Sequence, residues 1–211
     1  MTFSSVYEMF NPLTTVAKQH SWNWLSGDQI SNEFLEQNVA GTGSGAMNDT
    51  VDGGFRVTSG ATTNNETQYG WNNKRTVDFT DFRFTGVMSA VSVTSQISYI
   101  GVQTGMGLTH SNGSTSKSLI MMDTGNTNFA IKTCLNGAIS ETEGSTAIDT
   151  AWHVYRIEGS SSSNIMKLDG TTEVTKTTNL PTQKMNSLFG VQTLTSSAKS
   201  TDVRYTEVMN I

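Results

Sequence analysis

Glu141 and Glu143 stand two positions apart in the sequence, just before Gly144. Side chains at this spacing point to the same face of a β-strand, so the pair would place two carboxylates side by side. Glycoside hydrolysis uses two carboxylates about 5 Å apart when it retains the anomeric configuration and about 6.5–9.5 Å apart when it inverts it. Charged side chains near a strand end also protect a sheet edge from aggregation. We expect this second role for the pair.

Other residue types that carry catalysis lack a supporting pattern. The three histidines, His20, His110 and His153, are far apart in sequence and do not have zinc-ligand spacing. The run GTGSG at 41–45 loosely matches a phosphate loop or a nucleophile elbow, but no Lys-Ser/Thr follows it and we expect a flexible loop. Cys134 is the only cysteine, and we expect it to be a buried apolar residue of a strand. We therefore expect no catalytic residues and no enzyme activity.

A short aromatic segment offers the best local pattern for binding a sugar. Glycan sites commonly combine an aromatic ring with amide side chains. The candidate ligand-binding residues are Tyr69, Trp71, Asn72 and Asn73. The competing interpretation is that Trp71 belongs to the core of a long strand.

Two clusters of oxygen-bearing side chains could hold calcium. They are Asn48 with Asp49 and Asp52, and Asp123 with Asn126 and Asn128. Both clusters also fit ordinary turn residues, which is the interpretation we favour. We expect no cofactor and no metal, with calcium as the open alternative.

The elements that would position these residues are β-strands. Residues 151–158 alternate between two faces, and Asp169-Gly170 and Asn136-Gly137 are favoured dipeptides for tight hairpin turns. The pattern predicts about twelve to fourteen strands, with Phe79, Phe82 and Phe84 in the core. Further strands are predicted at 55–58, 96–104, 117–123, 128–135, 185–194 and 201–211.

Composition limits the function classes. The chain has 211 residues, 15% of them charged, and a net charge of −5. No basic cluster is large enough to neutralise a nucleic-acid backbone, so we expect no nucleic-acid partner. No apolar run reaches the ~20 residues that span a bilayer, so we expect no membrane insertion. The first ten residues lack the basic start and apolar core of a signal peptide, which predicts synthesis in a cytoplasm.

One stretch carries a family resemblance. The run WHVYRIE at 152–158, MKLDGT at 166–171 and the Leu-Pro pair at 180–181 resemble the late strands of concanavalin A-like (laminin G-like) jelly-roll domains. The resemblance covers residues 22–211 and implies an all-β, antiparallel two-sheet sandwich. It also implies that residues 22–25 pair with residues 202–209. Glucanases of this fold use Glu-Xaa-Asp-Xaa-(Xaa)-Glu on one strand, and this sequence lacks that triplet.

The flanking segments extend the resemblance. Residues 41–60, NNKR at 72–75 and KSTDVRYTEVMNI at 199–211 resemble versions of this domain in virion proteins of tailed phages and related viruses. Residues 1–20 differ in character, with aromatic residues at helical spacing: Phe3, Tyr7 and Phe10. We predict an N-terminal arm or helix at 1–20 and a sandwich domain at 21–211. The arm either packs on its own domain or attaches to a neighbouring subunit.

These observations lead to one expected function and one alternative. The expected function is a virion structural protein, a capsid decoration protein or a tail or fibre component, that acts by protein–protein adhesion. Its partners would be other virion proteins, such as the major capsid protein, and further copies of the chain in a homo-oligomer, and its location would be the virion. The alternative is a lectin-like, carbohydrate-binding module that attaches to host or surface glycans.

Overall fold

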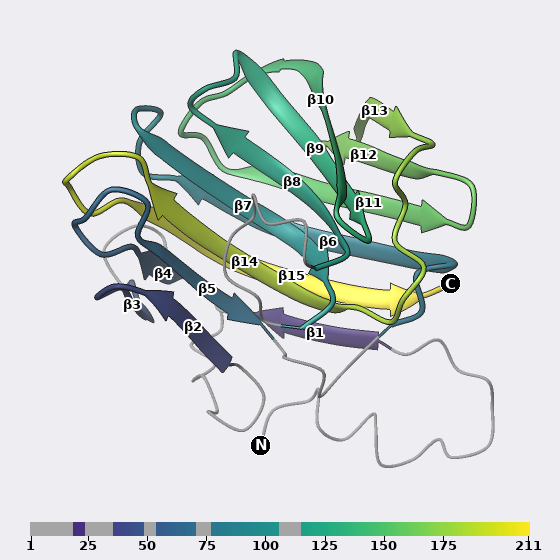
Figure 1. Cartoon of the computed structure of the whole chain (residues 1–211), viewed down its shortest axis with the longest axis horizontal. Coiled ribbons are helices and arrows are strands. Elements are labelled where there is room, and N and C mark those ends of the chain that lie inside the picture. The colour runs from purple at the N-terminus through teal and green to yellow at the C-terminus, as the bar shows by residue number, and fades with distance from the viewer. Residues whose placement is uncertain (1–18, 24–35, 49–53, 71–76, 106–114) are drawn as a thin grey trace.

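The computed structural model of the protein describes residues 19–23, 36–48, 54–70, 77–105 and 115–211 (Figure 1). These residues form fifteen β-strands, slightly more than the sequence predicted. The strands are β1 (Gln19–Asn23), β2 (Glu36–Ala40), β3 (Ser44–Met47), β4 (Phe55–Thr58), β5 (Glu66–Gly70), β6 (Asp81–Ala90), β7 (Gln96–Gln103), β8 (Lys117–Asp123), β9 (Asn128–Leu135), β10 (Ala138–Ala147), β11 (His153–Ser160), β12 (Asn164–Leu168), β13 (Thr171–Lys176), β14 (Asn186–Thr193) and β15 (Ser200–Asn210). Within the described residues, no helix is long and apolar enough to cross a membrane.

The strands form two antiparallel sheets, which confirms the predicted all-β sandwich. Sheet A has eight strands in the order β13-β12-β11-β6-β15-β4-β3, with β1 also paired to β15. Sheet B has seven strands in the order β10-β9-β8-β7-β14-β5-β2. Neighbours in both sheets are often distant in sequence, as when β15 pairs with both β4 and β6.

The predicted pairing of residues 22–25 with the last strand is confirmed for Trp22 and Asn23, which are the two that lie within the described part. Residues Gln19–Asn23 lie antiparallel to Tyr205–Met209 (Figure 1). The strand begins at Gln19, so Gln19 and His20 belong to the sheet, although we expected the sandwich to begin at residue 21. The division into an arm and a domain stays a prediction, since residues 1–18 lie outside the described part.

The core lies between the sheets and is built from alternate side chains of most of the strands. The predicted core residues Phe79, Phe82 and Phe84 are 2%, 0% and 0% exposed, which confirms them. Near β4 and β5 the rings of Phe55, Tyr69 and Phe189 contact one another with centroids 5.0–6.2 Å apart. Offset or edge-to-face ring contacts of this kind add to the stability gained by burying apolar area.

The run 41–45 is only in part the loop that we expected, since residues 41–43 lie outside the strands. Ser44 and Gly45 belong to β3, which pairs with β4. A Cβ atom on Gly45 would come within 2.4 Å of the Phe55 ring and 2.7 Å of the Tyr69 ring. Glycine at this position therefore lets an edge strand lie directly against the aromatic core. The sequence showed the glycines but not the two rings that require them.

The turn chemistry was predicted correctly. Asn136-Gly137 and Asp169-Gly170 all have positive φ, at 49°, 91°, 50° and 87°. A type I′ turn requires positive φ at both central residues. These turns fix the hairpins β9–β10 and β12–β13.

One carboxylate joins the edges of the two sheets. Glu173 on β13 of sheet A accepts hydrogen bonds from the backbone and the hydroxyl groups of Ser145 and Thr146 on β10 of sheet B, at 2.7–3.1 Å. Burial raises the pKa of Glu173, but these hydrogen bonds outweigh it and lower the pKa below the ordinary value. The ionised carboxylate therefore closes this side of the sandwich.

Candidate functional site on the outer face of sheet B

The outer face of sheet B consists of the side chains that alternate with those of the core. Because successive residues of a strand point to opposite faces, the neighbours of core residues Ile100, Ile120 and Phe189 point outward. A second cluster of buried apolar residues lies on this face: Ile97, Tyr99, Leu119, Met121 and Leu188. Polar and charged side chains share the face with this cluster, and they too are buried: Glu66, Gln68, Gln103, Lys117, Lys132, Asn186 and Gln192.

Tyr99 organises the centre of this face. Its hydroxyl donates to Glu66 Oε1 at 2.6 Å and accepts from Gln68 Nε2 at 3.3 Å. The ring reaches β5 because Gly190, on the strand between, has no side chain; a Cβ there would lie 2.3 Å from the hydroxyl. Burial and the Glu66 carboxylate raise the pKa of Tyr99 well above its ordinary value, so the phenol stays protonated and donates.

Two lysines occupy the part of the face formed by β8 and β9. Lys117 is fully buried, and this burial is the main cause that lowers its pKa to about 8. Lys132 is 7% exposed and its Nζ lies 3.0 Å from Glu141 Oε2 on β10. Buried charged groups with perturbed pKa values are concentrated at functional sites, because desolvating them costs free energy that the fold alone does not require.

The face meets solvent along β10, which we call the β10 rim. β10 is the edge strand of sheet B, as expected for Glu141 and Glu143. Ile139 on the rim is 40% exposed. Glu141 also accepts from Asn126 Nδ2 at 2.7 Å, and Glu143 accepts from the backbone of Thr127 and Asn128. The two glutamates are therefore fixed by the turn beside them.

The described carboxylates of this face do not form a close pair at its centre. Glu66 is on β5, whereas Glu141 and Glu143 are on β10, five strands away. At about 4.8 Å per strand this is about 24 Å across the sheet, well beyond the spacing that retaining or inverting hydrolysis needs. Within the described residues, Glu66 therefore lies on the opposite side of the sheet from the two glutamates of β10.

The predicted ligand-binding residues fall partly outside the described part. Tyr69 is 7% exposed and lies in the core between the sheets, and its burial raises the pKa of the hydroxyl to about 12. It cannot present its ring on the outer face. Trp71, Asn72 and Asn73, like the attachment candidates Phe3, Tyr7 and Phe10, lie outside the described residues, so their roles stay predictions.

The calcium candidates act as hydrogen-bonding turn residues where they are described. Asp123 Oδ1 accepts from the backbone of Gly125 at 2.8 Å, and Asn128 Nδ2 donates to the Gly144 carbonyl at 2.9 Å. Asn48 donates to Asp202, while Asp49 and Asp52 lie outside the described residues. The described part contains no group of three or more His, Cys, Asp or Glu side chains placed to hold a metal ion.

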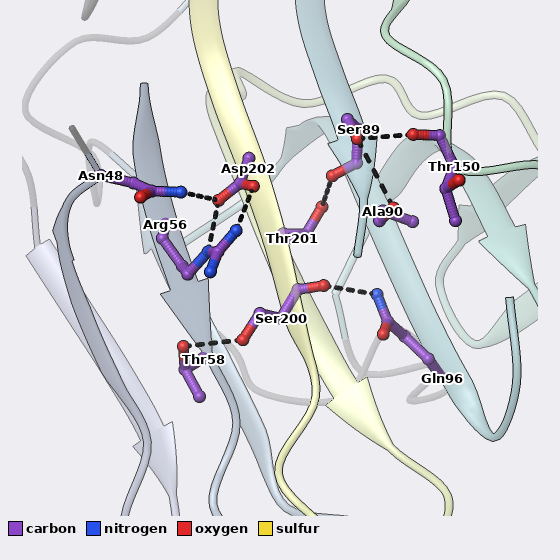
Figure 2. Close-up of polar contacts among 10 residues, drawn as sticks. All are labelled: Asn48, Arg56, Thr58, Ser89, Ala90, Gln96, Thr150, Ser200, Thr201 and Asp202. Atoms are coloured by element: carbon purple, nitrogen blue, oxygen red, sulfur yellow. Dashed lines mark hydrogen bonds and ion pairs between the residues drawn. The ribbon is translucent and has the colours of Figure 1, made fainter. Parts of the chain in front are cut away.

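A second polar cluster lies on the outer side of sheet A (Figure 2). Asp202 on β15 accepts two bonds from the Arg56 guanidinium on β4, at 2.8 and 2.7 Å, and one from Asn48 at 3.4 Å. A neighbouring bond joins Thr58 to Ser200 across the same strands. Bidentate pairing compensates both charges, so this cluster joins β4 to β15.

His153, which we expected to be structural, is held between two carboxylates. Its Nδ1 lies 2.6 Å from Asp169 Oδ2 and its Nε2 lies 2.9 Å from Asp149 Oδ1. Burial lowers the pKa of His153, but its hydrogen bonds to the two carboxylates, which accept them, outweigh this effect and raise the pKa above the ordinary value. This Asp-His-Asp clamp joins the β10–β11 loop to the β12–β13 turn.

Sequence analysis missed Glu66, Tyr99, Lys117 and Lys132 as a group. A usable signal was present in β8, where Lys117, Leu119 and Met121 share one face. What it could not show is that β5, β7 and β9 would lie beside β8, because these strands are brought together by pairings between distant segments.

Comparisons with known proteins show the fold. No protein-family model and no curated protein matches the sequence. Among solved structures, a prokaryotic β-1,3-1,4-glucanase (lichenase) derived from a mouse hindgut metagenome has a TM-score of 0.69 at 10% identity, with 92% of this chain and 100% of that chain covered. The Crh5 transglycosylase in complex with NAG has a TM-score of 0.65 at 14% identity, with 92% and 85% covered. The Emp47p carbohydrate recognition domain has a TM-score of 0.64 at 7% identity, with 95% and 99% covered.

These neighbours correct one expectation and leave another without support. The fold is a concanavalin A-like jelly roll, as predicted. The expectation that the chain is not an enzyme is wrong as an inference from the sequence, because glycoside hydrolases and a transglycosylase share this fold. The predicted phage and virion context finds no support among the neighbours, whereas the lectin-like alternative is compatible with them.

Proposed function

We propose that the protein binds a glycan at the β10 rim, where the outer face of sheet B meets solvent. The observation that carries this proposal is the burial of charged and amide side chains on that face, around the hydrogen bonds that link Tyr99, Glu66 and Gln68. Sites for polar ligands combine apolar surface with a few placed hydrogen-bonding groups, and this face has both. The named activities of the neighbouring structures, on glucans and in carbohydrate recognition, support the same class of ligand.

The β10 rim is the side from which the ligand would arrive. The centre of the face is buried, whereas Ile139, Glu141 and Glu143 on the rim are exposed. Lys132 lies just behind the rim and is bonded to Glu141. A glycan seated on the rim would contact these side chains first.

A matched pair of apolar residues provides the test. Ile139 on the rim and Val154 on the outer side of sheet A are both 40% exposed. Binding of the protein to a panel of neutral and acidic polysaccharides is measured by affinity electrophoresis, then repeated with Ile139→Ala and Val154→Ala. We expect Ile139→Ala to weaken binding about three- to tenfold, since loss of an apolar contact costs about 1 kcal/mol, and Val154→Ala to leave it unchanged. Absence of binding to every polysaccharide, or equal losses in both variants, would contradict the proposal.

Cleavage or transfer of the bound glycan is a second candidate, favoured by the buried Glu66 carboxylate on the same face. Each polysaccharide that binds is incubated with the protein, and new reducing ends are counted. If the bound glycan is turned over through Glu66, Glu66→Gln removes the turnover while binding remains.

The virion role also stays a proposal, together with its partners and its location. Mass spectrometry of purified virus particles would test it directly. Presence of the chain in particles would support attachment, and absence would leave the glycan-binding proposal alone.

A further inference from the structure

The connection between β10 and β11, residues 148–152, carries the chain from sheet B to sheet A. Its Asp149 carboxylate contacts His153 at the start of β11, with Oδ1 2.9 Å from Nε2. The same oxygen accepts a hydrogen bond from the backbone of Ala151 at 2.7 Å, which is a contact within the connection. The imidazole of His153 therefore joins this side chain to the sandwich.

The other ring nitrogen faces a carboxylate that is held by the backbone as well. Asp169, in the turn between β12 and β13, has its Oδ2 2.6 Å from Nδ1 of His153. Its second oxygen accepts from the backbone of Val154 at 2.8 Å, and its own N–H donates to the Val154 carbonyl at 2.9 Å. These two backbone hydrogen bonds hold Asp169 in place independently of the imidazole.

Aromatic rings pack against the imidazole, which is 8% exposed. The ring of Phe129 on β9 has its centroid 5.1 Å away and that of Tyr155 on β11 lies at 6.2 Å, both edge-on. On β6 the residue opposite His153 is Met88, which is buried. Burial is the main cause that raises the pKa of Tyr155 far above its ordinary value, so its hydroxyl stays neutral. The two carboxylates are therefore the charged groups that act on the imidazole.

The protonation state of the imidazole decides how many of these contacts are hydrogen bonds. An imidazolium has an N–H group at each nitrogen, so it donates to both carboxylates. A neutral imidazole has one N–H group, and its other nitrogen is an acceptor that cannot bind an ionised carboxylate. Burial lowers the pKa of His153, but its hydrogen bonds to Asp169 and Asp149 outweigh this effect, so the imidazole loses its proton above the ordinary value of 6.5.

We propose that His153 is a pH switch that opens the connection between β10 and β11. As the pH rises above neutrality, the imidazolium gives the proton on Nε2 to water and keeps the proton on Nδ1, which stays bound to Asp169. The unprotonated Nε2 then faces the ionised Asp149 carboxylate, and the two acceptors repel each other. Asp149 leaves the imidazole, and residues 149–151 move with it. This device is separate from the proposed glycan site and does not depend on it.

Two neighbouring contacts limit how far the connection moves. The Thr150 carbonyl accepts from the Ser89 hydroxyl on β6 at 2.9 Å (Figure 2). The centre of the Trp152 ring lies 3.8 Å from the guanidinium carbon of Arg204 on β15. Neither contact involves the imidazole, so both persist when its proton is lost. The switch therefore opens the connection locally at residues 149–151 and leaves the two sheets intact.

Nuclear magnetic resonance of the ¹⁵N-labelled protein between pH 5.5 and 9.0 tests the switch. Spectra of the His153 ring report which nitrogen loses its proton, and we expect Nε2. The Ala151 amide, which is bonded to Asp149, should shift with the same midpoint as the ring. Its protection from hydrogen exchange, corrected for the pH dependence of intrinsic exchange, should fall at least about tenfold. The Gly125 amide is the control, because it donates in the same way to Asp123, which is not a partner of His153.

Matched variants of the two aspartates assign the effect to the imidazole. In Asp149→Asn the amide group can accept from a protonated Nε2 and donate to an unprotonated one, so the Ala151 amide should no longer respond to pH. Asp123→Asn should leave the response of Ala151 as in the wild type. The Asp149 side chain is 50% exposed, so its variant should fold, which circular dichroism verifies.

Three results of the titration would overturn the switch. They are loss of the proton from Nδ1, a midpoint at Ala151 that differs from that of His153, and an equal response at Gly125. An unchanged response of Ala151 in Asp149→Asn would overturn it as well. None of these measurements uses a glycan, so each outcome leaves the proposed function to its own test.

Discussion

Each sheet has an outer face, formed by the side chains that point away from the core. The two outer faces differ in how far their charged side chains are buried. On sheet A, the charged residues of β11 and β12 are partly exposed, and Lys167 pairs with Glu158 at 2.8–2.9 Å. On sheet B, Glu66 and Lys117 are 0% exposed. Surface ion pairs cost little to form and contribute little, whereas buried charges must be compensated. This difference is the reason that we place the proposed glycan site on sheet B, whereas the buried Asp202 of sheet A is compensated by Arg56.

Adding a single methyl group to the outer face of sheet B should give the largest loss of stability. In Gly190→Ala the new Cβ would lie 2.3 Å from the Tyr99 hydroxyl and 2.7 Å from the Thr67 carbonyl. We expect a loss of about 3 kcal/mol in the free energy of unfolding, because overpacking forces the ring and the backbone to move. Thr175→Ala, on the exposed side of β13, should change stability by less than about 0.5 kcal/mol. Urea denaturation of both variants measures the two losses. Equal losses of stability would mean that the two faces tolerate substitution equally well.

Removing the Tyr99 hydroxyl should have the next largest effect. Tyr99→Phe deprives Glu66 Oε1 of a 2.6 Å hydrogen bond inside the protein. Loss of a hydrogen bond to a buried charged group costs about 2 kcal/mol. We expect this loss in urea denaturation, and we expect it to shrink in the double variant with Glu66→Gln, since the neutral amide needs less compensation. If removing the hydroxyl costs as much stability in the Glu66→Gln background as in the wild type, the hydroxyl acts through other contacts.

The Asp-His-Asp clamp near the start of β11 predicts a pH dependence. The pKa of His153 is raised in the folded protein. The stabilisation that the charged imidazole gives the fold is therefore fully present below about pH 6.5 and is lost as the pH rises through the pKa of the folded state. Burial raises the pKa of Asp149, but its hydrogen bonds with His153 and Ala151 outweigh burial and lower the pKa. The stabilisation from the ionised Asp149 is therefore lost as the pH falls below about 3.8. We expect the wild-type protein to lose more stability than His153→Gln between pH 5.5 and 8.5. An NMR titration of His153 that gives an ordinary pKa would remove the basis for this prediction.

The smallest effect should come from the ion pair on sheet A. The side chains of Lys167 and Glu158 are 25% and 29% exposed. Exposed pairs of this kind contribute about 0.2–1 kcal/mol and are screened by salt. Lys167→Met should therefore lower stability by less than about 1 kcal/mol at low salt and by less still at 0.5 M NaCl. A larger loss that does not depend on salt would show that the faces differ less than their burial suggests.

Local patterns in the sequence were sufficient for the strands and their turns. β8 and β9 were predicted with their observed bounds, and the Asn-Gly and Asp-Gly turns have the expected positive φ. Alternation and turn chemistry depend on residues close in sequence, so they can be read without the fold. Pairing of β1 with β15 was predicted only because the family resemblance implied it.

The candidate site was decided by the tertiary structure. The segment 66–70 contains a glutamate, a glutamine and a tyrosine, but the sequence directed attention to Tyr69, whose ring lies in the core. The outer face instead uses Glu66 and Gln68, joined to Tyr99 from thirty-three and thirty-one positions away. Which face of a strand is buried, and against which neighbour, depends on long-range pairing.

What the sequence determined by itself is an antiparallel all-β chain with defined hairpins and an apolar core, because these follow from period-two alternation and from residues that favour particular φ values. Only the tertiary structure decided that Lys117 and Lys132 lie together and that Gly190 makes room for Tyr99. The physical reason is that burial and charge proximity arise from contacts between strands that are distant in the chain, and a local pattern does not contain them.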